Sequence, residues 1–251
     1  SKIVIDTEIY NQVFNTDKKL LVGNEYKSGS YYRLFPIFGA AFNTPFKIKK
    51  NISDITFNPK IQLVISPGSS NSDKLSNEDS TNNDFSLDNI YRLNRFSGND
   101  KMDNSKRITF GIDTYNNKFK ASLAQTYEFT KNSDFHKEQK NDDNLSDLLG
   151  SLEYSNENEF LYNFRYDIED QYLKKQNINF KSKLKYGDFE ISYLDQNSKV
   201  NNIVTNDIET LNYSFASKRF SKFSKIKFNG LYDLKKEINK EYSIGYSYFD
   251  E

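Results

Sequence analysis

The amino-acid sequence predicts an all-β fold, namely an antiparallel transmembrane β-barrel of the outer-membrane type. Apolar and polar residues alternate along most of the chain, and short connections alternate with long ones. No segment keeps the 3.6-residue period of an amphipathic helix. A barrel that crosses a bilayer needs both alternations, because each strand has one face in lipid and successive turns lie at opposite ends of the barrel.

The alternation of residues is clearest in segments 117–129, 159–169 and 174–186. In each, aromatic and aliphatic residues occupy one parity, and polar or charged residues occupy most of the other. Successive side chains of a strand point to opposite faces, so each segment has one apolar and one polar face. The residues that we expect to face lipid are Phe119, Leu123, Tyr127, Phe160, Phe164, Ile178, Phe180 and Leu184. The basic residues that we expect on the polar lumen wall are Lys118, Lys120, Arg165, Lys181, Lys183 and Lys185.

These patterns predict a partial barrel of about thirteen strands. The expected strands are 3–14, 18–26, 31–46, 55–66, 105–115, 118–129, 146–154, 159–169, 174–186, 189–195, 207–220, 223–234 and 241–249. The connections at 116–117, 155–158, 187–188 and 221–222 are short and built mainly from residues that tolerate hairpin dihedrals. Those at 130–145, 170–173, 196–206 and 235–240 are mostly longer and more polar. A β-sandwich also has hairpins, but it has no physical reason to keep its long loops at one end.

The largest interruption is a long loop at 67–104. Its first half, 67–84, consists mostly of Ser, Asn, Asp and Gly, which predicts a solvated loop. Its second half regains apolar residues over 85–96. We expect this half to pack back on the barrel, because an extra strand at 86–93 would disturb the alternation of strand direction.

Composition excludes several classes of protein. Lys+Arg and Asp+Glu are both 35 in 251 residues, so the chain lacks the basic field that nucleic-acid binding needs. Aromatic residues reach 16%, which argues against disorder despite a mean hydropathy of −0.82. Cysteine is absent, which excludes disulfides and thiolate metal sites within this stretch. The sequence has no run of about 18 apolar residues, which is the length that a transmembrane helix needs.

One stretch is specific enough to suggest a family. Residues 94–100 read Asn-Arg-Phe-Ser-Gly-Asn-Asp, and residues 106–112 read Lys-Arg-Ile-Thr-Phe-Gly-Ile. This pattern resembles the outer-membrane lipopolysaccharide-assembly family LptD, also called OstA or Imp, which carries Arg-Phe-Ser-Gly-x-Asp, a basic residue and then Arg-x-x-x-Gly. Asn99 and Lys101 stand where the family often has an aromatic residue and Arg. The residues of the motif are Asn94, Arg95, Phe96, Ser97, Gly98, Asp100, Lys101, Arg107 and Gly111.

Flanking segments extend the resemblance over nearly the whole chain. Residues 31–36 resemble the Arg-x-x-Pro strand of the family, 58–67 resemble its segment before the long loop, and 77–80 lie where it has an acidic patch. Residues 232–233 and 244–248 resemble its late strands. The resemblance implies that residues 1–251 belong to one LptD-type barrel domain. It also implies a periplasmic jellyroll domain and terminal barrel strands outside these residues. We expect the chain to be an internal part of a longer protein, because it begins without Met and stops at its last expected strand.

The resemblance also implies a function. The chain is expected to belong to a translocon in the Gram-negative outer membrane that inserts lipopolysaccharide into the outer leaflet. Its expected partners are lipopolysaccharide, membrane lipids, an LptE-like lipoprotein that plugs the barrel and an LptA-like periplasmic bridge. No bond is made or broken, so we expect no enzyme activity, cofactor, metal or nucleic acid.

The roles of single residues are narrower hypotheses. We expect hydrogen bonds of Arg95 and Asp100 to lock the loop into the barrel mouth, although 97–100 alone could be an ordinary turn. Pro36 and Pro45 remove ladder hydrogen bonds and should weaken one strand on one side, as prolines near the lateral seam do in the family. His136 has no predicted catalytic partners, and the acidic pairs 78–79 and 142–143 are interpreted as solvated loop charges.

Two alternatives share part of this pattern. A generic porin or substrate-specific outer-membrane channel has the same periodicities and lacks only the motif. A soluble β-sandwich binding module has the same two-residue alternation, with its aromatic residues facing a core. A requirement for detergent would distinguish the sandwich, and ion conductance of an unplugged barrel would distinguish the channel.

Overall fold

The structure is a computed structural model of the chain. It describes residues 1–20, 26–49, 54–67, 77, 79–80, 85–130, 144–200, 203–218 and 224–248. His136, which has no predicted catalytic partners, lies outside these ranges. So do Glu78 and the acidic pair 142–143, which we interpreted as solvated loop charges.

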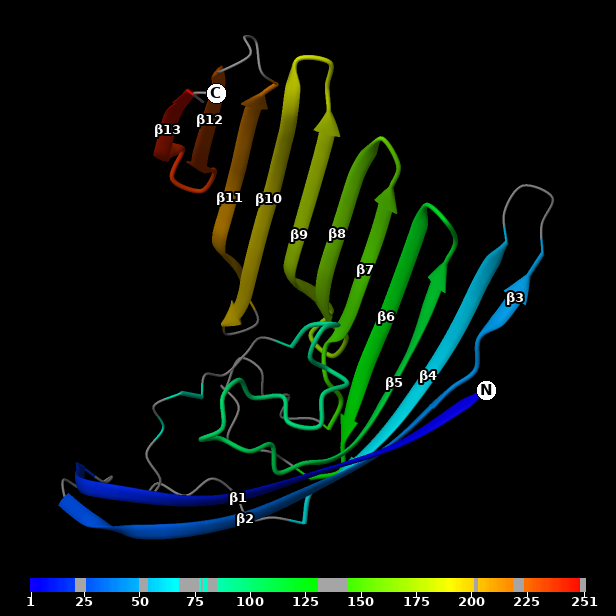
Figure 1. The fold of residues 1–251 in the computed structure, drawn as a ribbon, viewed down its shortest axis with the longest axis vertical. Coiled ribbons are helices and arrows are strands. Elements are labelled where there is room, and N and C mark those ends of the chain that lie inside the picture. Colours follow the sequence, from blue (N-terminus) through cyan, green and yellow to red (C-terminus); the bar gives the residue numbers. More distant parts are fainter. Residues whose placement is uncertain are drawn as a thin grey trace. The chain divides into compact units, whose positions relative to one another are not determined.

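The described residues form thirteen β-strands, which Figure 1 shows in chain order. They are β1 Lys2–Leu20, β2 Tyr26–Asn43, β3 Phe46–Ile48, β4 Ile55–Ile65, β5 Lys106–Tyr115, β6 Phe119–Glu128, β7 Leu148–Ser155, β8 Asn158–Asp167, β9 Tyr172–Lys183, β10 Gly187–Val200, β11 Ile203–Ser217, β12 Ser224–Asp233 and β13 Ile238–Tyr248. All belong to one sheet in which neighbours along the chain are neighbours in space, except that β3 pairs only with β4. The predicted all-β fold of about thirteen antiparallel strands is therefore confirmed. One sheet does not support the sandwich alternative, which needs two.

The described residues include no helix that is long and apolar enough to cross a membrane.

Two strand boundaries near the start of the chain differ from the prediction. The expected strand at 18–26 is wrong, because β1 continues to Leu20 and Tyr26 already begins β2. The ladder shifts its register between Thr16 and Lys19, where Lys18 has a φ of 48°. This irregularity within β1 looks like a strand end in the sequence, because polar residues interrupt the alternation there.

The expected long connection at 196–206 is also wrong. β10 runs to Val200 and β11 begins at Ile203, and the pairs Ser198↔Thr205 and Lys199↔Val204 belong to the ladder. Backbone pairing needs no apolar side chain, so a polar strand extension has the composition of a loop. The hairpin of β10 and β11 therefore extends beyond the residues whose apolar alternation predicted it.

The chain divides into two compact units. Unit 1 comprises Ser1–Phe46, Phe57–Ile112 and Ala124–Asp147, and unit 2 comprises Lys47–Thr56, Asp113–Leu123 and Leu148–Glu251. The hydrophobic core of unit 1 consists of Phe35 and Ile37 from β2, Val64 from β4, and Leu93 and Met102 from the connection between β4 and β5. Strands and connection thus share one core.

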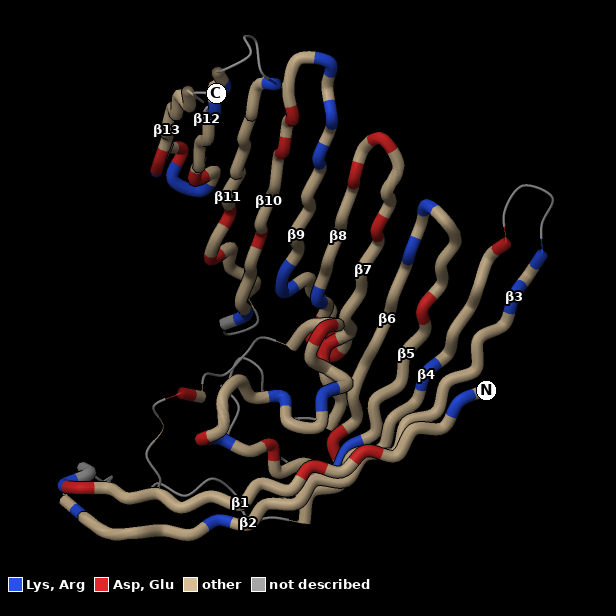
Figure 2. The backbone as a smooth tube through the Cα atoms, viewed as in Figure 1, with Lys and Arg blue, Asp and Glu red and all other residues tan. Residues whose placement is uncertain are grey.

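In unit 2 the ladder keeps the two faces separate across neighbouring strands. Phe160 pairs with Phe180, while Glu159 pairs with Lys181 on the opposite face. The next strand continues both rows, since Lys181 pairs with Glu190 and Phe180 with Ile191. Figure 2 shows an uncharged middle between charged ends in both β8 and β9. Register therefore extends the alternation of single strands into one apolar and one polar surface.

Three glycines of unit 2 lie against aromatic rings of the neighbouring strand. A Cβ added at Gly150, Gly187 or Gly230 would overlap the ring of Phe164, Phe215 or Tyr213, respectively. Gly150 pairs directly with Phe164, and Gly230 with Tyr213. Each ring occupies the space that a glycine leaves, so the apolar face stays closely packed at these glycines.

Candidate functional site

The segment between β4 and β5 carries the motif found in the sequence. We call residues 85–105 the anchored loop. Among these residues the structure has no strand, but it has a turn in which Ile90 N–H donates to the Ser86 carbonyl at 3.0 Å and Arg92 N–H to the Asn89 carbonyl at 3.0 Å. The Asn89 side chain caps the turn by accepting the Ser86 N–H at 3.0 Å. Local hydrogen bonds therefore satisfy backbone N–H and C=O groups in the first part of the loop, where the chain leaves the sheet.

Apolar side chains fix the anchored loop to the strands. Leu93 and Met102 are buried in the core of unit 1, and Ile90 and Phe96 are buried as well. Gly39 of β2 lets Leu93 come close, because a Cβ at Gly39 would overlap the Leu93 side chain. Fully burying such a side chain contributes about 1.5–3 kcal/mol relative to leaving it in water.

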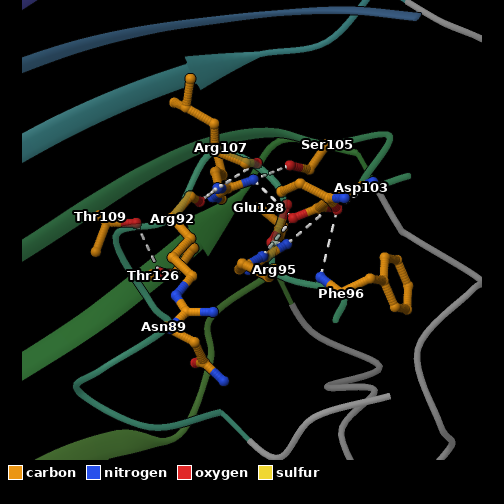
Figure 3. A network of polar contacts seen from close by, with 12 residues as sticks. Asn89, Arg92, Arg95, Phe96, Asp103, Ser105, Arg107, Thr109, Thr126 and Glu128 are labelled. Atoms are coloured by element: carbon orange, nitrogen blue, oxygen red, sulfur yellow. Dashed lines mark hydrogen bonds and ion pairs between the residues drawn. The ribbon is translucent and has the colours of Figure 1, made fainter. Parts of the chain in front are cut away.

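Four charged side chains form a network, two from the anchored loop and one each from β5 and β6 (Figure 3). Arg95 donates from Nε to Asp103 Oδ2 at 2.5 Å and from Nη2 to Glu128 Oε1 at 2.6 Å. Arg107 of β5 donates from Nη1 to the same Asp103 oxygen at 2.9 Å. Figure 3 shows both guanidinium groups directed at Asp103. Asp103 thus joins the loop to β5, and Arg95 joins it to Glu128 of β6.

Arg107 also holds the loop backbone. Its Nη2 donates to the Leu93 carbonyl at 3.1 Å and to the Arg92 carbonyl, and its Nη1 donates to Ser105 Oγ. Carbonyl groups that the loop cannot pair internally therefore find a charged donor. Charge-assisted hydrogen bonds of this kind are stronger than those between neutral groups.

The network is buried and electrically balanced. Arg95, Asp103 and Arg107 expose 1%, 0% and 0% of their surface. Two cations face two carboxylates, and the ring of Phe85 covers the Arg95 guanidinium at 4.9 Å. Removing one partner of such a group leaves a buried charge without compensation, which costs about 3–5 kcal/mol. The four residues therefore depend strongly on one another.

The loop charges of the network are held in their ionised forms. Burial of the Asp103 carboxyl opposes its charge, but Arg95 and Arg107 outweigh that effect and lower the pKa of Asp103. Burial likewise opposes the charge of Arg95, and Asp103 and Glu128 outweigh it and raise the pKa of Arg95 above its usual value. Both groups therefore remain charged at neutral pH.

The Ser-Gly-Asn-Asp part of the motif makes a separate contact with Asp79. The Asp79 carboxylate accepts the N–H groups of Asn99 at 3.0 Å and Asp100 at 2.9 Å, and Asp100 Oδ2 accepts the Asp79 N–H at 2.9 Å. These backbone donors lower the pKa of Asp79. Gly98 has a φ of 78°, and a Cβ there would overlap the Asp79 carbonyl. Glycine is therefore required by conformation and by space.

Arg33 of β2 ties this turn to the first hairpin. Its Nη1 donates to the Asp100 carbonyl at 2.6 Å, and its Nη2 donates to the Asn99 carbonyl at 2.7 Å. Gln12 of β1 accepts from Arg33 Nε at 3.0 Å and donates to the Asn99 carbonyl at 3.0 Å. The anchored loop is therefore bonded to β1 and β2 through residues 99–100, and to β5 and β6 through the flanking Arg95 and Asp103.

A comparison with known protein families identifies the family of this chain. A family described as LptD, LPS transport system D, matches residues 3–238. The chain belongs to the LptD family. No curated protein matches the chain. The LptD family is an outer-membrane β-barrel family that serves lipopolysaccharide transport, so the fold class and the resemblance that the sequence suggested are confirmed.

The structure brings together only part of the predicted LptD motif. Arg95 and Arg107 converge on one carboxylate, and Asn94 beside them accepts the Phe96 N–H at 3.3 Å and the Asp103 N–H at 3.1 Å. Lys101 lies over the ring of Phe96 at 5.7 Å. Ser97 is half-buried in the turn, and Gly111 lies four residues beyond Arg107 in β5.

The structure adds a second loop carboxylate to Asp100, which we expected to hold the loop. Asp100 is only half-buried and bonds with Asp79, whereas Asp103 is fully buried between the two arginines. Sequence analysis missed Asp103 and Glu128. One signal was present, because the two arginines of the motif stand in a chain whose basic residues are mostly lysine, and arginine suits bidentate pairing with a buried carboxylate.

The two prolines lie at irregularities of β2. Pro36 pairs with Ile9 of β1, but pairing of β2 with β4 starts only at Phe38↔Ile65 and ends at Asn43↔Lys60. Ser66 Oγ donates to the Pro36 carbonyl at 3.3 Å. Pro45 lies between β2 and β3, so the strand expected over 31–46 is interrupted there because proline cannot donate to the ladder.

Proposed function

We propose that this chain forms part of the outer-membrane translocon that inserts lipopolysaccharide into the outer leaflet. The match to the LPS transport family over residues 3–238 carries the proposal. Lipopolysaccharide has acyl chains and a polar sugar portion, so its path needs both an apolar and a polar environment. The two-faced sheet offers both, without any residue that must make or break a bond.

The apolar face supports a location in the outer membrane. Phe119, Leu123, Phe160 and Leu184 are exposed, as are Tyr242 and Ile244 of β13, each of which exposes 75% of its surface. Exposed apolar side chains on successive strands would be a liability in water, whereas a lipid-facing barrel wall requires them. We propose that this face contacts hydrocarbon and that the polar face lines the lumen.

The anchored loop supports a role inside the barrel. It packs on the side of β5 and β6 that carries Arg107, Thr109 and Thr126, where the two threonine hydroxyls bond at 2.8 Å. We propose that the loop is a fixed part of the lumen wall, and that the motif residues of the LptD family hold it there. In this proposal Arg95, Gly98 and Arg107 act by holding the loop in place, and they need not contact the substrate.

The proposed partners follow from the transport role. Lipopolysaccharide would enter from a periplasmic bridge protein, a lipoprotein would plug the lumen, and acyl chains would leave through a gap between strands into membrane lipid. A jellyroll domain and the remaining barrel strands would complete the protein outside these residues. Pro36 lies just outside the ladder of β2 and β4, which starts at Phe38↔Ile65, so β2 is paired on one side only at this proline.

Depletion of the full-length protein tests the transport role. Newly made lipopolysaccharide should fail to reach the cell surface, and large antibiotics should enter the cells, while re-expression restores both. Normal surface delivery in depleted cells would contradict the proposal. Unchanged lipopolysaccharide delivery with reduced uptake of one small solute would favour a substrate-specific channel.

Spin labels on the full-length protein in lipid test the orientation of the faces. Labels at Phe119 and Phe180 should be relaxed by lipid-soluble reagents, and labels at Lys120 and Lys181 by aqueous ones. The reverse pattern would refute the assignment of the two faces.

A further inference from the structure

A cavity lies over the last four strands of unit 2. It has a volume of about 420 Å³, and strands β10 to β13 supply all its lining residues. Small-molecule sites in proteins typically have volumes of about 300–1,000 Å³. The cavity is therefore large enough for part of an extended ligand.

Register places the polar lining of this cavity on one face. Glu190 of β10 pairs with Ser214 of β11, Ser214 pairs with Asn229 of β12, and Asn229 pairs with Ser243 of β13. Ser192 pairs with Asn212 in the neighbouring row. Paired residues of a sheet lie on the same face, so hydroxyls, amides and carboxylates form a continuous surface over four strands.

Much of this surface has hydrogen-bonding capacity to spare. In the part of the chain that the structure describes, the side chains of Ser192, Asn212 and Ser214 have no hydrogen-bonding partner. Asn229 donates to Ser243 Oγ at 3.2 Å, and Glu190 accepts from Asn179 at 3.0 Å. Each of these groups has further donor or acceptor sites for a ligand.

The charge of the lining selects against phosphate. Its described residues include two carboxylates, Glu190 and Glu241, and no lysine or arginine. Lys181 of the neighbouring strand is 3.3 Å from Glu190 and pairs with it. A phosphate group would meet two carboxylates here, of which Lys181 compensates one, and it would find no cation among the described residues of the lining itself. A sugar hydroxyl can instead donate to a carboxylate and accept from an amide.

We propose that this cavity is a subsite for the uncharged sugars of lipopolysaccharide. The inference deepens the proposed function and rests on it, since it assigns one portion of the substrate to one portion of the wall. Amides, hydroxyls and carboxylates bind the sugar hydroxyls, and the charge of Glu241 together with a described lining free of lysine and arginine disfavours the phosphorylated portion of the substrate.

Photo-crosslinking in living cells tests the subsite with the full-length protein. A photoreactive amino acid replaces Asn212 inside the cavity, and a matched variant carries it at Asn163, on the polar face of β8 outside the cavity. Each variant is expressed in cells that make complete lipopolysaccharide and in cells whose lipopolysaccharide ends at its phosphorylated inner sugars. Crosslinking at Asn212 should fall at least five-fold with the truncated substrate.

Equal crosslinking of both substrates at Asn212 would overturn the sugar subsite but leave transport intact. Crosslinking at Asn163 without any at Asn212 would overturn it in the same way. Absence of crosslinks at both positions would overturn it and would also count against the transport role. The substitution Glu241→Lys adds a charge test, because it should raise crosslinking of the truncated phosphorylated substrate at Asn212 at least two-fold. No change in that variant would contradict the selection against phosphate.

Discussion

The two units keep their strands in order by different means. In unit 1 a loop crosses the strands and is held by a buried network of two arginines and two acidic residues. In unit 2 the order comes from successive ladders with at most one register shift in each printed pairing, from cross-strand pairs such as Phe160↔Phe180 and from glycines covered by rings. A few contacts carry much of the specificity in unit 1, whereas many similar contacts share it in unit 2.

This difference predicts how each unit responds to substitution. One substitution in the network of unit 1 leaves a buried charge without its partner, which lowers the free energy of unfolding strongly. One substitution in a ladder of unit 2 removes only one of many cross-strand contacts. All variants are compared in the full-length protein refolded in lipid.

The substitution Asp103→Ala should have the largest effect. It leaves Arg95 and Arg107 buried without their shared carboxylate, which should lower the free energy of unfolding by about 3–5 kcal/mol. Limited trypsin digestion should then cleave the anchored loop at Lys101. The control is Asp100→Ala in the same loop, which removes a partly exposed hydrogen bond worth about 0.5–1.5 kcal/mol. Equal sensitivity of the two variants would show that the buried network does not hold the loop.

The substitution Gly98→Ala should have the second largest effect and lower the free energy of unfolding by about 1–3 kcal/mol. The residue has a φ of 78°, which strains any residue with a Cβ, and that Cβ would overlap the Asp79 carbonyl. Gly29→Ala is the matched control, because its Cβ would meet nothing closer than the Tyr31 hydroxyl at 3.7 Å. Urea titration of both variants provides the comparison. A tolerated Gly98→Ala would mean that the turn does not need the contact with Asp79.

The substitution Gly230→Ala should lower the free energy of unfolding by about 1 kcal/mol. The new methyl would overlap the outer end of the Tyr213 ring, which can turn aside, so the cost lies at the low end of the range for overpacking. Gly245→Ala serves as control, since its nearest contact would be Lys227 Cβ at 3.9 Å. If the two variants unfold at the same urea concentration, the ring does not depend on the glycine.

The substitution Lys181→Ala should have the smallest effect, below about 1 kcal/mol. Its ion pair with Glu190 spans 3.3 Å, but both side chains are nearly half exposed and are screened by solvent. Urea titration at low and high salt measures the difference. A loss above about 2 kcal/mol would contradict the view that unit 2 distributes its stability.

The sequence was sufficient for features that repeat, and insufficient for features that depend on distant residues. The parity of Phe160 and Phe180 follows from a two-residue period, which the ladder of β8 and β9 keeps from Asn158 to Arg165. Asp103 was missed because a buried aspartate looks like an exposed one until the fold brings Arg95 and Arg107 to it. Asp79 was noted only as one residue of an acidic patch, since its partners lie 20 and 21 residues away.

The predicted connection at 196–206 failed for a related reason. Polar residues there were interpreted as a loop, but their backbone groups continue the ladder of β10 and β11. Side-chain polarity marks where the apolar surface ends, and it does not mark where hydrogen bonding between strands ends. Lysine at position 18 illustrates the same limit, because nothing in its type indicates the positive φ.

The sequence separation of the loop contacts has a consequence for the order of folding. Neighbouring strands join residues that are close along the chain, whereas Arg33 reaches Asp100 across 67 residues and Gln12 reaches Asn99 across 87. Closing such long segments carries a larger entropic cost than closing a hairpin. Arg95 also needs Glu128, which comes 33 residues later and must already lie beside β5. The loop can therefore dock only after β1 to β6 have assembled, so its protection from protease reports the completion of unit 1.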